Sequence, residues 1–227
     1  MAIRLYGRHL ISVRDLNPAE TTMVLDTAAA MERAACRTRT GRILKGRLVA
    51  VLFFEPSTRT RLSFEAAALR LGARVLSVAD AGSSSAAKGE TLEDTVRVVS
   101  GYADCIVLRQ NKAGGARRAA DAATVPLINA GDGAGEHPTQ ALLDLFTIRK
   151  EMGRLDKLTV AVVGDLKYGR TVHSLCYALM PYAPRFICCA PPELRLPEAI
   201  GNDLGAAGLQ VTETESLEEA LRADVVY

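Results

Sequence analysis

Hydroxyl and guanidinium side chains fill the short segment Ser57-Thr58-Arg59-Thr60-Arg61. An apolar run of β type (48–54) precedes it and a helical pattern (62–71) follows, so the segment is predicted to join a strand to a helix N-terminus. The first backbone N–H groups of a helix have no internal partner and carry partial positive charge. With added hydroxyl donors and a planar cation, such a turn is suited to hold a phosphate. The alternative is an N-capped helix with two solvated arginines.

Three further polar side chains follow predicted strands. Arg109 ends the apolar run 104–109, and His137 and Gln140 lie at the start of a helix predicted from Pro138. Ligands of open α/β sheets bind outside the carboxyl ends of strands, so Arg109 is expected in the same layer as the segment 57–61. His137 and Gln140 are three residues apart and share one face. The alternative for His137 is a capping or surface role.

Two other loops carry candidate residues. The segment 80–90 is small and polar and contains a lone Lys88 beside glycine, so it is either a simple connector or a functional loop. The turn 164–171 follows another buried-type strand. A Gly-Asp turn at this place is a hint of nucleotide binding. The hint is weak, because the glycine fingerprint G-x-G-x-x-G of dinucleotide-binding enzymes is absent.

The elements that position these residues alternate between strand and helix, which indicates parallel sheets. We expect helices over 18–36, 91–102, 113–123 and 138–152, and strands over 48–54, 73–78, 104–109 and 126–129. A boundary near 153–156 precedes a second set, with strands over 158–164, 185–190, 211–212 and 223–227 and helices over 172–180 and 217–222. The fold class is therefore α/β, in two domains of residues 1–150 and 151–227.

Composition excludes several classes of protein. The 227 residues are 48% hydrophobic and 24% charged with a net charge of +2, which argues against a nucleic-acid binder. No apolar run has the length of a membrane span, and the N-terminus lacks a signal-peptide core. The cysteines have no metal-type spacing and are interpreted as buried thiols in a reducing cytoplasm, without a bond between the adjacent pair. They are Cys36, Cys105, Cys176, Cys188 and Cys189. We expect no metal and no cofactor.

Five segments together resemble the aspartate/ornithine carbamoyltransferase family. They read FFEPSTRTRLSFE (53–65), KGET (88–91), LR (108–109), NAGDGAGEHPTQ (129–140) and GDLKYGRTVHSL (164–175). The aspartate branch is the more similar, because the ornithine branch is not expected to carry Lys88 before Gly-Glu or the last of these segments. The resemblance runs along the whole chain.

The resemblance implies two doubly wound parallel-sheet domains with the active site in the cleft between them. Residues 1–150 would bind carbamoyl phosphate and residues 151–227 would bind aspartate. It also implies a homotrimer whose sites are shared between subunits, in a cytoplasmic enzyme of pyrimidine biosynthesis from an allosteric family. A regulatory chain or another pathway enzyme is a possible partner, and nucleic acid and membrane are not.

Residue roles follow from the same resemblance. The phosphate is expected to meet Ser57, Thr58, Arg59 and Thr60. The carbonyl oxygen of carbamoyl phosphate is expected to meet Arg109, His137 and Thr60, and its amide nitrogen Gln140. Arg170, followed by Thr171, would bind a carboxylate of aspartate. Ser84 and Lys88 lie on a loop that the family lends to the neighbouring subunit, and Lys88 counts with Arg59, Thr60, Arg109 and His137 among the expected catalytic residues.

The implied reaction gives N-carbamoyl-L-aspartate and phosphate. The family pattern continues beyond the final strand with loops that supply a second carboxylate-binding arginine, so the aspartate domain is incomplete in these residues. The alternative is a catalytically incomplete scaffold subunit that binds carbamoyl phosphate. An ornithine carbamoyltransferase is a weaker option.

Overall fold

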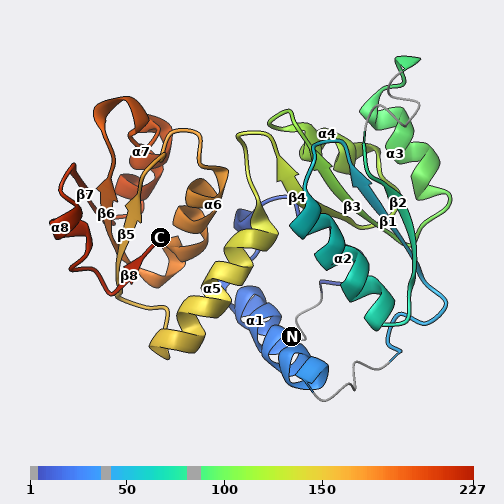
Figure 1. Ribbon diagram of the computed structural model, residues 1–227, viewed down its shortest axis with the longest axis horizontal. Coiled ribbons are helices and arrows are strands. Elements are labelled where there is room, and N and C mark those ends of the chain that lie inside the picture. Colours follow the sequence, from blue (N-terminus) through green and yellow to red (C-terminus); the bar gives the residue numbers. More distant parts are fainter. Residues whose placement is uncertain (1–4, 37–41, 81–87) are drawn as a thin grey trace. The chain divides into compact units, whose positions relative to one another are not determined.

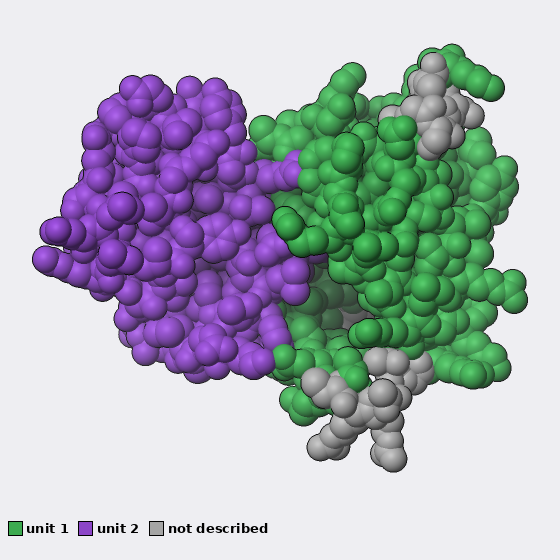
Figure 2. Space-filling model, in the orientation of Figure 1, with its two compact units in different colours: residues 1–138 green, residues 139–227 purple. Residues whose placement is uncertain are grey.

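Two compact units make up the chain, residues 1–138 and 139–227 (Figure 2). The computed structural model describes residues 5–36, 42–80 and 88–227. Each unit is built on a four-stranded sheet in which every strand pair is parallel. The predicted fold class, α/β with two parallel sheets and flanking helices, is therefore confirmed.

The sheet of the first unit has the strand order β2-β1-β3-β4 (Figure 1). Its strands are β1 (Leu48–Phe53), β2 (Arg74–Val78), β3 (Cys105–Gln110) and β4 (Leu127–Asp132). The helices of the unit are α1 (Pro18–Cys36), α2 (Thr58–Arg70), α3 (Leu92–Ser100) and α4 (Gly115–Ala122), with a short 3-10 turn η1 (Val13–Asp15). The helix α2 begins at Thr58, four residues before the predicted helical pattern, so the hydroxyl-rich segment forms its first turn.

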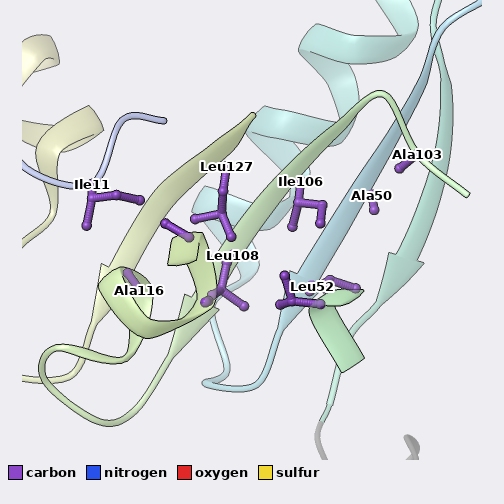
Figure 3. Packing of buried hydrophobic residues seen from close by; sticks show 11 residues of the cluster. Ile11, Ala50, Leu52, Ala103, Ile106, Leu108, Ala116 and Leu127 are labelled. Carbon is purple, nitrogen blue, oxygen red and sulfur yellow. The ribbon is translucent and has the colours of Figure 1, made fainter. Parts of the chain in front are cut away.

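The strands β1, β3 and β4 are largely buried on both faces, which explains their apolar runs, whereas the edge strand β2 is largely exposed. Successive side chains of a strand point to opposite faces, and the core divides accordingly. On one face Leu52, Ile106 and Leu108 pack with residues of α3 and α4 such as Val96 and Ala116 (Figure 3). The other face, with Val51, Phe53 and Val107, packs with Phe64 and Ala68 of α2. Helices on both faces make this unit doubly wound, and the rigid sheet fixes where each strand ends.

The sheet of the second unit has the strand order β7-β6-β5-β8. Its strands are β5 (Thr159–Val163), β6 (Arg185–Cys189), β7 (Gln210–Thr214) and β8 (Val225–Val226). The helices are α5 (Pro138–Met152), α6 (Arg170–Leu179), α7 (Glu198–Ala206) and α8 (Leu217–Ala220), with 3-10 turns η4 (Met180–Tyr182) and η5 (Pro192–Leu194). Apart from Pro138, α5 belongs to this unit.

The helix α7 was missed in the sequence. Its segment Glu-Ala-Ile-Gly-Asn-Asp-Leu-Gly-Ala holds two glycines, an asparagine and an aspartate, all poor helix formers. Ile200 and Leu204 are four residues apart and both are buried. Tertiary packing of these two side chains therefore outweighs the weak local preference.

The prediction of buried thiols is confirmed for three of the cysteines that the structure describes. Cys176, Cys188 and Cys189 are buried and free, and Cys105 is half-buried and free. Burial raises the pKa of the Cys105 thiol to about 11, so the neutral thiol dominates near neutral pH. Within the described residues no helix is long and apolar enough to cross a membrane.

Candidate functional site

The carboxyl ends of β1 and β3 lie at the point where the strand order of the first unit reverses. From β1 the chain moves to β2 on one side and then returns to β3 and β4 on the other. Such a switch point is the usual place for a ligand in an open α/β sheet. Here Phe53 pairs with Arg109, and the backbone N–H of Phe54 donates to the carbonyl oxygen of Arg109 at 2.8 Å. The predicted layer of site residues is thus formed by the register of two adjacent strands.

The first turn of α2 faces this edge. Ser57 is the N-cap residue in extended conformation (φ −162°, ψ 106°), and its hydroxyl makes no capping hydrogen bond. Thr58 and Arg59 are exposed and Thr60 is half-buried. The helix start therefore combines backbone N–H groups with hydroxyls that are not used in capping, as an anion site requires.

Arg109 lies buried at the end of β3, with 7% of its surface exposed. Its Nη2 donates to Oε1 of Glu55 at 2.5 Å, and its Nη1 donates to the carbonyl oxygen of Ala130 at 3.3 Å. Glu55 follows the end of β1 and Ala130 lies within β4, so acceptors from the segments on both sides of β3 hold the guanidinium. An anionic ligand that binds Arg109 must compete with Glu55 for it.

His137 lies beside Arg109, and Gly131 separates the two. Gly131 has φ +120°, and a Cβ at that position would be 3.1 Å from Nη1 of Arg109 and 3.5 Å from Cδ2 of His137. His137 is buried and directly precedes α5. The backbone thus passes close to both side chains, which only glycine allows here. Arg109 and His137 therefore flank Gly131, and their roles toward a ligand stay predictions.

Replacement of Gly131 by alanine is expected to lower activity by about 10- to 100-fold, because the methyl group would displace Arg109 and His137. The unfavourable φ should also cost about 1–3 kcal/mol of stability. The control is Gly153→Ala, at φ +73° with no atom within 4 Å of the new Cβ. It should lose stability but keep activity. Steady-state kinetics and thermal melts would separate the two; an unimpaired, active Gly131→Ala protein would contradict the crowding.

The loop between β4 and His137 is held by buried amide and carboxyl groups. Asp132 accepts from the backbone N–H of Gly114 at 3.0 Å and of Glu136 at 2.7 Å. Asn129 donates to the carbonyl oxygen of Ile11 at 3.0 Å and accepts from the N–H of Gly131 at 2.8 Å. These bonds fix the backbone on both sides of Gly131, so they position the two side chains beside it.

The two carboxyl groups of this loop are partly desolvated. Burial raises the pKa of Asp132, although the N–H groups of Glu136 and Gly114 lower it again. Burial also raises the pKa of Glu136, whose carboxyl accepts from the hydroxyl of Ser12 at 2.8 Å. Neither carboxyl is exposed as a free base, and both serve to hold the loop.

Lys88 is the predicted residue of the loop 80–90 that the structure describes. Lys88 is exposed and makes no hydrogen bond or ion pair with the other described residues. Ser84 lies outside the described residues.

Arg170 and Thr171 form the first turn of α6 in the second unit, at the carboxyl end of β5. The preceding turn is held by Asp165, whose Oδ1 accepts from the backbone N–H groups of Lys167 at 3.2 Å and Tyr168 at 2.9 Å. Buried His173 donates from Nε2 to the carbonyl oxygen of Leu166 at 2.8 Å. The two predicted residues are thus placed at a helix N-terminus, which favours carboxylate binding. Gln140 lies in the first turn of α5.

Two pockets of the first unit differ in what they could bind. A pocket of about 340 Å³ at the carboxyl edge is lined by residues next to the Glu55–Arg109 pair, including Phe54 and Gln110. A larger one of about 580 Å³ lies at the opposite, amino ends of the strands, beside Val49, Cys105 and Ile128. Its lining is largely apolar, so it does not suit a phosphate. Among the described residues no group of His, Cys, Asp or Glu could hold a metal ion.

The site contains residues that the sequence did not single out. Glu55 was not among the predicted site residues, yet it pairs with Arg109. Asn129 and Asp132, which hold the loop before His137, were not among them either. One sequence signal could have found them. A polar residue at or just beyond the end of an apolar strand is expected to point into the site or to bind its loops.

Residues 8–150 match the family model described as aspartate/ornithine carbamoyltransferase, carbamoyl-P binding domain. The aspartate carbamoyltransferase catalytic subunit of Methanothrix thermoacetophila is 52% identical over 221 residues, which cover 97% of this chain and 72% of that protein. The corresponding subunit of Methanococcoides burtonii is 53% identical over 220 residues, or 96% of this chain and 71% of its own length.

Solved structures give the same picture. The catalytic subunit of M. jannaschii aspartate transcarbamoylase superposes with a TM-score of 0.87 at 52% identity, covering 93% of this chain and 70% of that one. The aspartate transcarbamoylase of Trypanosoma cruzi in complex with carbamoyl phosphate and aspartate superposes with a TM-score of 0.92 at 38% identity. It covers 98% of this chain and 72% of that one.

Proposed function

This chain belongs to the aspartate/ornithine carbamoyltransferase family, and we propose from that premise how it works. It transfers the carbamoyl group of carbamoyl phosphate to the amino group of L-aspartate, giving N-carbamoyl-L-aspartate and phosphate. The observation that carries this assignment is the meeting of a phosphate-type helix start with the buried Arg109–Glu55 pair at one switch point. Residues 1–150 bind carbamoyl phosphate and residues 151–227 belong to the aspartate domain.

The phosphate is bound by the first turn of α2. Ser57, Thr58 and Thr60 donate from hydroxyl and backbone N–H groups, and Arg59 supplies the charge. The fork of the Arg59 guanidinium can engage two oxygens at once, which a lysine cannot do. Each charge-assisted hydrogen bond contributes about 1.5–3 kcal/mol.

The carbonyl oxygen of the substrate is bound by Arg109, His137 and Thr60. As the aspartate amine attacks the carbamoyl carbon, negative charge develops on this oxygen and phosphate leaves. Donors that already point at the developing charge lower the barrier without reorganisation. We propose that the leaving phosphate accepts the amine proton. A pH–rate profile that demands a protein base of matched pKa would contradict this step.

The second substrate is bound by residues of the second unit. Arg170 and Thr171 bind a carboxylate of aspartate at the start of α6, and Gln140 accepts from the amide nitrogen of carbamoyl phosphate.

Lys88 and Ser84 act in the site of a neighbouring subunit of a homotrimer. The exposure of Lys88 and its lack of partners among the described residues support that proposal. Free, buried thiols support a reducing cytoplasm as the compartment.

The direct test is an assay for N-carbamoyl-L-aspartate, run in parallel with ornithine as acceptor. Turnover with aspartate and none with ornithine is the expected result, since the relatives described above carry the aspartate activity in their names. Turnover with ornithine alone would overturn the assignment. Binding of carbamoyl phosphate without any turnover is what a scaffold subunit would show; the names of the relatives support the enzyme over that alternative.

Arg59→Ala is expected to weaken carbamoyl phosphate binding by about 10²- to 10⁴-fold, the equivalent of two charge-assisted hydrogen bonds. The fold should persist, because Arg59 is exposed and forms no ion pair with the described residues. Calorimetric titration measures the affinity, and Arg70→Ala at the other end of α2 is the matched control. Unchanged affinity of the Arg59→Ala protein would show that the phosphate lies elsewhere.

A further inference from the structure

Four polar side chains of the second unit form a connected chain of hydrogen bonds. Gln140 and Asp144 are one turn apart on α5, and Nε2 of Gln140 donates to Oδ1 of Asp144 at 2.9 Å. The Asp144 carboxyl is also hydrogen-bonded to the side chain of Tyr227, and Tyr227 is hydrogen-bonded to the side chain of Thr171. These hydrogen bonds therefore connect the first turn of α5 with the first turn of α6.

This arrangement differs from an ordinary solvated pair on a helix surface. Asp144 is half-buried, and its Oδ2 is enclosed without an aligned donor anywhere in ranges 5–36, 42–80 and 88–227. Tyr227 is anchored beside β5: its N–H donates to the carbonyl oxygen of Ala161 at 2.9 Å, and its carbonyl oxygen accepts from Val163 at 3.0 Å. The carboxyl group thus sits between a helix and a strand and has little freedom to turn.

Burial raises the pKa of Asp144, while the hydrogen bonds from Gln140 and Tyr227 lower it. Those two bonds favour the charged form of the carboxyl, because a carboxylate can only accept. The Gln140 amide and the Tyr227 hydroxyl both donate, so both stabilise the carboxylate form of Asp144.

The hydrogen bond to Asp144 determines which end of the Gln140 amide can face a ligand. A glutamine amide carries an oxygen that only accepts and a nitrogen that only donates, and either end can face a ligand. Since the carboxylate of Asp144 takes the nitrogen, the oxygen Oε1 points the other way. The amide nitrogen of carbamoyl phosphate is a hydrogen-bond donor, so Gln140 can recognise it only through Oε1.

We propose that Asp144 is a positioning residue that fixes the amide orientation of Gln140 for the carbamoyl NH₂ group, with Tyr227 holding Asp144 in place. The inference deepens the proposed function and rests on it. Asp144 touches no substrate in this scheme and acts through Gln140. Through Thr171 and Tyr227 the same network connects the residues for both substrates to the half-buried carboxylate of Asp144.

The test compares ligands with and without the NH₂ group. Binding of carbamoyl phosphate, acetyl phosphate and inorganic phosphate to the wild-type protein and to Asp144→Leu is measured by calorimetry. Asp144→Leu should bind carbamoyl phosphate about 3- to 10-fold more weakly, the loss of one hydrogen bond. Its affinity for acetyl phosphate, which has a methyl group in place of the NH₂ group, and for phosphate should stay within about twofold. Retained phosphate affinity also shows that the variant is folded.

Three further variants sharpen the result. Asp144→Asn keeps an acceptor oxygen and should recover part of the discrimination, and Tyr227→Phe should lose a smaller part of it. Glu151→Leu, an exposed acid on the same helix, is the matched control and should bind all three ligands normally. In a double mutant with Gln140→Leu, the Asp144→Leu change should have no further effect on carbamoyl phosphate, because both act on one contact.

Equal losses for all three ligands in Asp144→Leu would show a general structural role and overturn the inference. Unchanged carbamoyl phosphate affinity in that variant would overturn it too. A wild-type protein that does not bind carbamoyl phosphate would refute the proposed function itself, and the inference with it. Normal wild-type binding with an indifferent Asp144 refutes the inference alone.

Discussion

Arg109→Ala is expected to lower kcat by about 10²- to 10³-fold, the usual effect of removing one donor to a developing oxyanion. Arg109 is held by Glu55, just after β1, and by the carbonyl oxygen of Ala130 in β4, so the protein itself orients its guanidinium. Such a donor contributes most when charge forms on the carbonyl oxygen, and kcat should fall more than the affinity for carbamoyl phosphate. Steady-state kinetics combined with calorimetric titration would measure both effects.

Two comparisons give this prediction its meaning. Arg109→Lys keeps the charge but loses the fork that meets Glu55 and a ligand together, so only partial activity is expected. Arg97→Ala removes an exposed arginine paired with Asp94 on α3 and should change nothing. The fold of Arg109→Ala should persist, since the Glu55 side chain is 22% exposed and can reach water. A loss confined to carbamoyl phosphate affinity, with kcat intact, would assign Arg109 to substrate binding only.

The Glu55–Arg109 pair also gives a buried cation its counter-charge. Arg109 is 7% exposed, and an isolated charge at that depth would be costly. Glu55 neutralises it at 2.5 Å, and the ligand must take over this role. An anion that binds Arg109 must displace Glu55, and this displacement lowers the observed affinity for the anion.

Much of this site could be predicted from sequence because parallel strands bring their carboxyl ends to one edge. The apolar run before Ser57 and the one ending at Arg109 predicted two such strands, and β1 and β3 are adjacent. The limits of α5 follow from Pro138 at its first position, which is a strong local signal. Local signals of this kind place elements and the residues at their ends.

Pairings between distant segments could not be predicted in the same way. The Glu55–Arg109 bond depends on the register of β1 against β3, which no local pattern contains. Gly131 was not among the predicted site residues, yet it leaves room for Arg109 and His137. Tyr227 and Asp144 are 83 positions apart in the chain and meet only because β8 lies next to β5. Side chains that position others are therefore the ones that sequence reasoning misses.

Lys88 raises a separate question, since it is expected to act on a site that its own chain does not contain. If the protein is a homotrimer with shared sites, each site takes His137 from one chain and Lys88 from its neighbour. Lys88→Ala and His137→Ala proteins should each be nearly inactive alone. Mixed after dissociation and reassembly in equal amounts, they should recover about a quarter of wild-type activity, because about one site in four receives both intact residues.

The controls follow from the same counting. Mixing Lys88→Ala with Arg109→Ala should recover activity to the same extent, since Lys88 and Arg109 would come from different chains. Mixing His137→Ala with Arg109→Ala should recover none, because both side chains flank Gly131 in one chain and every site would carry a defect. Recovery in the mixture of His137→Ala with Arg109→Ala, or no recovery in the mixture of Lys88→Ala with Arg109→Ala, would mean that the subunits do not share sites in this way. The pattern across the mixtures separates residues by the chain that supplies them, which depends on Lys88 reaching a neighbour and on Arg109 and His137 staying together.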